Sequence, residues 1–193
     1  MVDYPLFLQL DGRPCLVIGG GAVAFRKAAA LLRCGAKVTV VSPELSGGLK
    51  RLARDQKIRW LKRRFRPADL GGMELAVAAT DDQQVNLLAA REARHQKVWI
   101  NVVDQPRLCS FILPSVVRRG KLVLAISTGG ASPALAKWIR RDLETRYGPE
   151  FGRLLARVGP LRGRVKRKIP SASERKRRYE RALQAYLREL KLK

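Results

Sequence analysis

The chain has 193 residues, 46% of them hydrophobic, with three scattered cysteines, Cys15, Cys34 and Cys109. This length buries a core without disulfides or metals, and the cysteine spacing fits neither, so we expect free thiols, no metal site and a cytoplasmic protein. The formal net charge of +24 favours a polyanionic partner, such as nucleic acid, an anionic membrane or a small polycarboxylate. No apolar run reaches the ~18 residues of a membrane span, and Met1–Pro5 is unlike a signal peptide, so we expect no membrane contact.

In the first half, short β-rich runs alternate with helical segments. This alternation indicates an α/β fold, with a parallel sheet that helices cover on both faces. The expected strands are Pro14–Ile18, Lys37–Val41, Ile58–Leu61, Leu75–Ala79 and Val98–Val103, and the expected helices are Ala22–Arg33 and Asp82–His95.

The pattern changes near residue 110. Two strand-like runs, Phe111–Arg118 and Lys121–Ser127, are separated by a glycine-containing turn, which predicts a β-hairpin. Ser132 has the position of a helix cap with Pro133 as the first helical residue, and this helix should end near Tyr147.

The last segment is helical and basic, because residues 151–193 hold 15 Lys or Arg against 3 Asp or Glu. We expect Gly159-Pro160 and then Pro170 to interrupt it. Ser171 has the spacing of a capping box with Glu174, so a final helix should begin there. The apolar stripe of that helix is Tyr179, Leu183, Tyr186, Leu187 and Leu190.

The glycine-rich segment after the first strand is the most informative local motif. Gly19, Gly21 and Ala24 match the pattern G-x-G-x-x-G/A between a strand and a helix, which is typical of Rossmann dinucleotide sites. Gly19 allows the tight turn, Gly21 admits the pyrophosphate and Ala24 keeps the helix near the sheet, while free helix amides bind phosphate. The alternative is an ordinary glycine turn in a cofactor-free α/β protein.

An acid near the end of the second strand normally accepts a hydrogen bond from the ribose of NAD. Glu44 lies in range, although it follows Pro43, and no arginine directly follows the strand to hold a 2′-phosphate. We therefore predict NAD rather than NADP. Glu44 could instead serve the dipole of the next helix.

Acidic residues also follow the fourth and fifth strands, where ligands of a parallel sheet bind. After Thr80, the acids Asp81 and Asp82 have the position of caps for the next helix, with direct chemistry as the alternative. Asp104 opens a loop rather than a helix, so it is a candidate general base, with a turn role as the alternative. The single histidine, His95, is explained by the dipole at a helix C-terminus.

A second loop of small residues, Ser127-Thr128-Gly129-Gly130, precedes a predicted helix. Its amides and hydroxyls could hold carboxylates. A helix cap with a flexible turn explains the same residues equally well.

Several motifs together resemble the precorrin-2 dehydrogenase family, which includes the N-terminal half of siroheme synthase. The resemblance covers residues 3–147, and the final 45 or so residues share only a short helical tail with the family. In order, the motifs are Tyr4-Pro5-Leu6-Phe7, Gly19–Ala24 with Arg26-Lys27, Val41–Glu44, Ala79–Asp82 with Asn86, Asn101–Asp104, and Ala125–Gly130 with Ser132-Pro133.

The resemblance implies NAD-dependent oxidation of precorrin-2, a tetrapyrrole polycarboxylate, to sirohydrochlorin. It also implies a homodimer and three parts: an NAD-binding Rossmann domain (residues 1–110), a dimerisation segment (111–148) and a basic helical C-terminal domain (149–193) over the active site. Some members also insert iron, and the same acid would then accept protons from the ring nitrogens.

The resemblance places the catalytic carboxylate on Asp104 and the active-site serine, which carries a phosphate in some members, on Ser127. With it we assign Thr128 and Gly129 to the substrate. The cofactor contacts that the resemblance implies fall on Ala22, Val23, Pro43 and Glu44, and we also assign Gly19, Gly21 and Thr80 to the cofactor.

Two other functions fit parts of the sequence. A nucleotide-sensing, nucleic-acid-binding protein would use the basic tail on phosphates, with steep salt dependence, although no nucleic-acid-reading motif is visible and we do not expect this partner. A NAD-dependent dehydrogenase of another small acid would need a smaller pocket and no helical tail.

Overall fold

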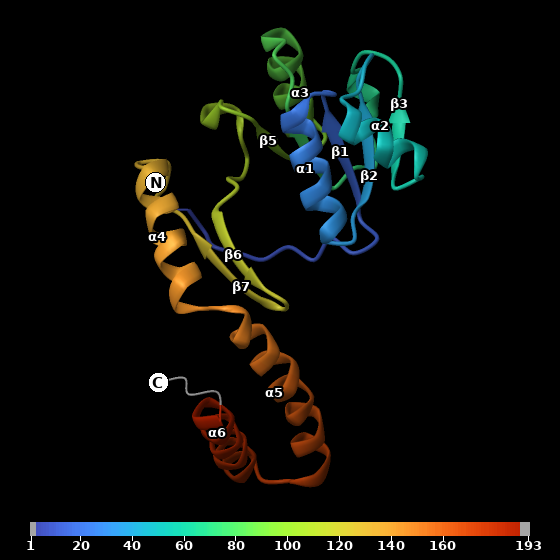
Figure 1. Cartoon of the computed structure of the whole chain (residues 1–193). Helices are drawn as coiled ribbons and strands as arrows, with labels where there is room; N and C mark the ends of the chain where they lie inside the picture. Colours follow the sequence, from blue (N-terminus) through green and yellow to red (C-terminus); the bar gives the residue numbers. More distant parts are fainter. Residues whose placement is uncertain (1–2, 190–193) are drawn as a thin grey trace. The chain divides into compact units, whose positions relative to one another are not determined.

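The computed structural model describes residues 3–189. The chain forms two compact units, with the boundary between Leu113 and Pro114 (Figure 1). The predicted further division of the second unit between residues 148 and 149 stays a prediction. None of the described helices is both long and apolar enough to cross a membrane.

The first unit is built on a five-stranded parallel sheet in the order β3-β2-β1-β4-β5. The strands are β1 (Pro14–Ile18), β2 (Lys37–Val41), β3 (Ile58–Leu61), β4 (Leu75–Ala78) and β5 (Trp99–Val102). The helices are α1 (Ala22–Arg33), α2 (Gly47–Arg54) and α3 (Gln83–His95), with short 3-10 turns at Pro67–Leu70 and Pro106–Leu108. This arrangement confirms the predicted α/β class. Compared with the prediction, β4 ends one residue earlier, and β5 is one residue shorter at each end.

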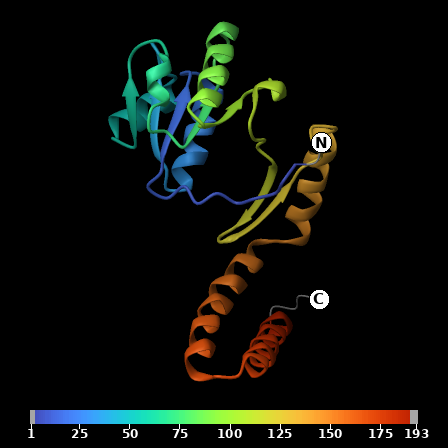
Figure 2. The same cartoon turned by 180° about the vertical axis from the view of Figure 1, so that it is seen from behind.

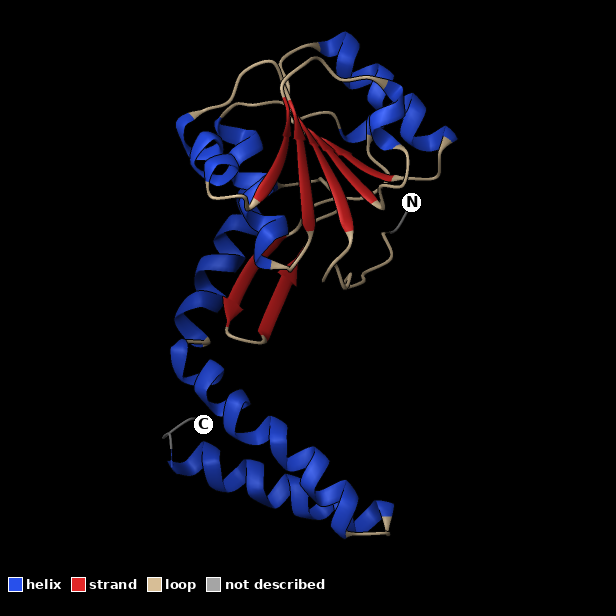
Figure 3. Cartoon of the chain, turned by 90° about the vertical axis from the view of Figure 1, so that its right-hand side faces the viewer, coloured by secondary structure: helices blue, strands red, loops and turns tan. Residues whose placement is uncertain are grey.

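Helices cover both faces of this sheet (Figure 3). On β1, Cys15 and Val17 face a core that includes Leu49 of α2 and the buried residues of α1. Leu16 and Ile18 face the opposite core, which α3 closes with three alanines. Because both faces are buried, the strand is apolar throughout, as its sequence predicted.

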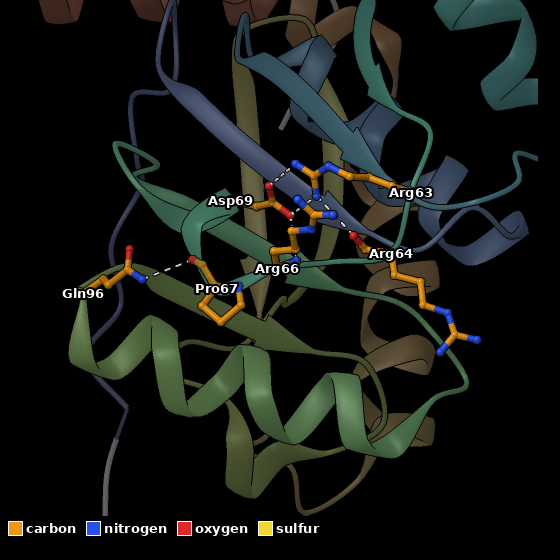
Figure 4. Close-up of polar contacts among 6 residues, drawn as sticks. All are labelled: Arg63, Arg64, Arg66, Pro67, Asp69 and Gln96. Carbon is orange, nitrogen blue, oxygen red and sulfur yellow. Dashed lines mark hydrogen bonds and ion pairs between the residues drawn. The ribbon is translucent and has the colours of Figure 1, made fainter.

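A salt bridge fixes the chain beyond β3 (Figure 4). Arg63 donates two hydrogen bonds to the carboxylate of Asp69, at 2.6 and 2.8 Å, and the Arg66 amide donates a third at 2.8 Å. Desolvation by burial acts to raise the pKa of Asp69, but the hydrogen bonds and charges of the two arginines outweigh it and hold the pKa below its usual range. Asp69 is therefore a structural carboxylate.

The second unit begins with an antiparallel hairpin of β6 (Ser115–Arg119) and β7 (Leu122–Ile126). The hairpin was predicted, but the expected first strand began too early at Phe111. The side chain of Phe111 packs on the core of the first unit, and its carbonyl accepts a hydrogen bond from Asn101 at 3.1 Å. Phe111 is therefore apolar because it packs on the core of the first unit, and it is not part of the hairpin.

Three helices complete the second unit: α4 (Pro133–Arg146), α5 (Pro149–Lys168) and α6 (Ala172–Glu189). The predicted break at Gly159-Pro160 is wrong, because α5 continues through Pro160. A proline in a helix interior costs about 3 kcal/mol. Packing of α5 along α6 offsets this cost, and the two run antiparallel (Figure 2).

The apolar stripe of α6 is confirmed in part. Tyr179, Leu183, Tyr186 and Leu187 are half-buried, while Leu190 lies outside the described residues. Arg157 of α5 lies 4.4 Å above the ring of Tyr186 and pairs with Glu189 at 2.9 Å. Ser171 accepts from the Glu174 amide at 3.4 Å, consistent with the predicted cap.

Candidate functional site

Four strand ends place most of the predicted site residues along one edge of the sheet. Register aligns the last residues of β2, β1, β4 and β5 in one row. Beyond them the ladder continues, because the amides of Gly19, Ala79 and Val103 donate to the neighbouring strand ends at 2.8 to 3.0 Å. The next residues outward in this row are Pro43, Gly20, Thr80 and Asp104.

The strand order reverses direction between β1 and β4, since the chain adds β2 and β3 on one side of β1 and β4 and β5 on the other. Ligands of open parallel sheets bind in the crevice outside such a switch point. The loops after β1 and β4 are therefore the two sides of the candidate site.

The three glycines after β1 serve different purposes. Gly19 has φ +119°, and a Cβ there would lie 2.3 Å from the Ala79 carbonyl oxygen. A Cβ on Gly20 would lie 1.8 Å from the Glu44 carbonyl oxygen. A Cβ on Gly21 would meet no atom of residues 3–189 within 4 Å, so these residues leave the space over this glycine open. The sequence motif did not single out Gly20, whose constraint depends on the β2–α2 loop.

Gly21 is the N-cap of α1, and within the described residues no side chain caps this helix. The first intrahelical bond is donated by Phe25 to the Gly21 carbonyl at 3.0 Å, so the amides of the preceding turn have no acceptor in the helix. Ala22 is exposed and Val23 is half-exposed there. Uncapped amides at the positive end of the helix dipole can bind an anion.

The loop from β2 to α2 lies against the glycine loop. The Ser46 amide donates to the Gly20 carbonyl at 2.7 Å, and Pro43 and Glu44 are exposed beside it. Because α2 begins at Gly47 with Ser46 as its N-cap, Glu44 lies before the first turn. Glu44 thus lies two residues ahead of the helix cap, and both the predicted contact with the ribose and the alternative role at the start of the helix stay predictions.

Asp104 is exposed in the turn after β5 with φ +58°, a left-handed conformation that Asp and Asn tolerate best among residues with a side chain. Lys27 of α1 lies close enough for the two charges to interact. Burial lowers the pKa of the Lys27 ammonium and repulsion from Arg26 adds to this, while the charges of Asp104 and Cys109 oppose it. The motif that carried the resemblance contains Lys27, but sequence reasoning gave it no role.

Asp82 caps α3, accepting hydrogen bonds from the amides of Gln84 and Val85 at 3.0 and 3.2 Å. This confirms the capping interpretation for Asp82. Asp81 is exposed at the same turn, and His95 is the last residue of α3, as expected.

The loop Ser127–Gly130 belongs to the second unit. Ser127 accepts from the Gly129 amide at 3.1 Å, and the Thr128 hydroxyl accepts from the Ser132 amide at 3.2 Å and donates to its carbonyl at 3.1 Å. Ser132 caps α4 by accepting from Leu135 at 3.2 Å. The polar groups of this loop are thus largely engaged with one another.

Three of the six basic residues of α6 lie together on one face of the helix. A shallow depression of about 450 Å³ lies there. Its lining residues are Arg177, Glu180, Arg181, Gln184 and Arg188. Three guanidinium groups against one carboxylate give this surface a net affinity for anions.

Residues 6–115 match the model of a putative NAD(P)-binding family. The chain belongs to this family. Residues 119–146 match the central region of sirohaem biosynthesis proteins, and residues 150–193 match the dimerisation region of sirohaem synthase.

Curated relatives extend the similarity over nearly the whole chain. A siroheme synthase of Methylobacillus flagellatus is 43% identical over 189 residues, and siroheme synthase 3 of Aeromonas hydrophila is 46% identical over 185. These matches cover 98% and 95% of this chain, which spans 40% of the length of each relative.

Among solved structures, the precorrin-2 dehydrogenase SirC is 27% identical and superposes with a TM-score of 0.80. The match covers 98% of this chain and 99% of that one. Together the comparisons confirm the resemblance drawn from the ordered motifs.

Proposed function

We propose that the chain oxidises precorrin-2 to sirohydrochlorin with NAD as the electron acceptor, a step in siroheme biosynthesis. The observation that carries this proposal is the full-length superposition on a precorrin-2 dehydrogenase, combined with a dinucleotide cradle and an exposed carboxylate on one sheet edge. The cradle and the carboxylate alone would fit many NAD-dependent dehydrogenases. The superposition favours precorrin-2 as the substrate.

The residues present fit a dinucleotide. The open space over Gly21 and the uncapped amides of Ala22 and Val23 would take the pyrophosphate. Glu44, ahead of α2, would accept from the adenosine ribose, which favours NAD over NADP. Thr80 would line the opposite side of the crevice.

The reaction removes a hydride and a proton from the reduced macrocycle. Bound NAD supplies the acceptor for the hydride. Asp104 would take the proton, and its exposed position in the row of strand ends supports this role. Lys27 provides a nearby positive charge for a substrate rich in carboxylates.

Other parts of the proposal rest on the second unit. The match to a dimerisation region supports a homodimer. Ser127, Thr128 and Gly129 would contact the substrate, and the arginine-lined face of α6 supports an anionic ligand. The three free thiols support a reducing compartment, the cytoplasm.

Anaerobic incubation with precorrin-2 and NAD tests the activity directly. Absorbance of NADH and of the oxidised ring should rise together in a one-to-one ratio. Absence of both signals in a sample that binds NAD by calorimetry would overturn the substrate assignment and leave the cofactor assignment standing.

The role of Asp104 is tested by Asp104→Asn. Asn tolerates the left-handed backbone equally well, so folding and the Kd for NAD should be nearly unchanged, while turnover falls by about 100-fold or more because the base is lost. Asp81→Asn, at the neighbouring strand end, is the matched control and should retain activity. Wild-type turnover in Asp104→Asn would refute the assignment.

A further inference from the structure

The loop after β4 forms one side of the proposed dinucleotide crevice, and it touches the glycine loop directly. The Ala79 amide donates to the Ile18 carbonyl at 2.8 Å. A Cβ on Gly19 would reach within 2.3 Å of the Ala79 carbonyl oxygen. The position of the residues that follow, from Thr80 onward, therefore sets the shape of the crevice at the switch point.

A side chain from the helix behind holds this loop. Asn86, in the second turn of α3, is 3% exposed and donates from Nδ2 to the Thr80 carbonyl oxygen at 3.0 Å. The Asp82 amide donates to the Thr80 hydroxyl at 3.1 Å, which fixes the same residue from the other side. Thr80 is thus restrained through both its carbonyl and its hydroxyl.

Packing alone does not explain an asparagine at this place. The Oδ1 atom of Asn86 is buried without a hydrogen-bond partner among the described residues. A buried acceptor left unpaired is costly, and an apolar side chain of the same shape would avoid that cost. The hydrogen bond from Nδ2 to the Thr80 carbonyl therefore explains why this position holds an asparagine.

We propose that Asn86 is a positioning residue for the dinucleotide: it acts through Thr80 to keep the loop after β4 at the distance from the glycine loop that NAD requires. The inference rests on the proposed function, because it assumes that NAD occupies the crevice between these loops. Asn86 itself lies beneath the loop and makes no contact with the ligand.

The deciding variant is Asn86→Leu in the full chain. Leucine has nearly the same shape and removes the unpaired buried oxygen, which offsets the loss of the donor to the Thr80 carbonyl, so Tm should change little. The Kd for NAD measured by calorimetry should increase about tenfold, and KM for NAD should increase with it while kcat changes little, because the loss is one of binding. A purely structural role predicts the opposite, a lower Tm with an unchanged Kd.

Two further variants keep the test decisive. Asn86→Asp retains the shape but turns the donor into a second acceptor facing the Thr80 carbonyl, so it should also weaken NAD binding. Ala93→Gly lowers the stability of the same helix far from the loop and should leave the Kd unchanged. If wild type binds NAD and both Asn86 variants bind it equally well, the inference is wrong; if wild type binds no NAD, the proposed function fails with it.

Discussion

Two loops of small residues precede helices in this chain, and they differ in what holds them. In the loop Gly19–Gly21, neighbouring backbone leaves no room for a Cβ on the first two glycines, and no side chain of the described residues caps the helix that follows. In the loop Ser127–Gly130, a Cβ on Gly129 or Gly130 would meet nothing within 4 Å, and Ser132 caps the next helix.

This difference distinguishes a loop that is stabilised by its own hydrogen bonds from one that leaves groups available to a ligand. In the second loop, the serine and threonine hydroxyls accept hydrogen bonds from the amides of Gly129 and Ser132, which leaves these two amides less available to a ligand. In the first loop, the amides at the start of α1 have no side-chain acceptor among residues 3–189, and neighbouring backbone excludes a side chain at Gly19 and Gly20. Polar groups left unpaired at a surface are available to a ligand, whereas groups paired within the fold stabilise it.

The largest expected effect comes from adding one methyl group to the first loop. Gly20→Ala would place a Cβ 1.8 Å from the Glu44 carbonyl oxygen, and backbone atoms cannot yield easily. We expect a loss of about 3 kcal/mol or more in the free energy of unfolding, measured in urea.

The matched change in the second loop is Gly130→Ala. The added Cβ would meet no described atom within 4 Å, but the alanine would have to adopt φ +81°. The free energy of unfolding should therefore fall by only about 1 kcal/mol. Equal losses in the two variants would show that the loops are not held differently.

A side-chain cap introduced into the first loop should weaken NAD binding and raise the free energy of unfolding. In Gly21→Asp, the carboxylate can accept from the free amides of α1, raising the free energy of unfolding by a few tenths of a kcal/mol. It would also occupy and repel the pyrophosphate, so the Kd for NAD should rise about 100-fold, or 2.7 kcal/mol. Gly21→Asn, which caps without charge, should weaken binding less. Unchanged NAD affinity in Gly21→Asp would place the phosphates elsewhere.

The same distinction applies to two carboxylates, because Asp69 is fully paired and Asp104 is exposed. We expect Asp69→Asn to lower the free energy of unfolding by about 2 kcal/mol, since hydrogen bonds to a charged group are lost. The lowered pKa of Asp69 means that its contribution is present above the unfolded pKa of about 3.9 and is lost as the pH falls through the folded pKa.

The difference between wild type and Asp69→Asn should therefore be constant near neutral pH and shrink below about pH 4. Urea unfolding at several pH values measures it. A difference that grows as the pH falls would contradict the assignment of a depressed pKa.

Much of the fold followed from local pattern. The limits of α1 and of the first three strands were predicted because buried parallel strands and helix-forming alanines leave clear periods in the sequence. Two predictions failed where tertiary packing outweighed local preference. Pro160 lies within α5 because α6 packs along it, and Phe111 joins the core of the first unit instead of a strand.

The site was predictable only as far as its chemistry is local. The glycine motif and Asp104 were found because a strand end and a helix start are visible in the sequence. Three other residues were given no role from the sequence. Gly20 is constrained by the Glu44 carbonyl in the β2–α2 loop, Lys27 interacts with the charge of Asp104, and Asn86 donates to the Thr80 carbonyl. Each is a contact between segments far apart in the chain.

The smallest effect concerns the cap that α1 lacks and α4 has. Ser132→Ala removes the acceptor for the Leu135 amide, so the first turn of α4 should be about 1 kcal/mol less stable. Hydrogen exchange of the Leu135 amide should become about five-fold faster, since 1.4 kcal/mol corresponds to tenfold. Ser132→Asp retains an acceptor and should preserve protection. If Ser132→Ala exchanged at the wild-type rate, the hydroxyl would not be the cap, and the second loop would have amides as free as those of the first.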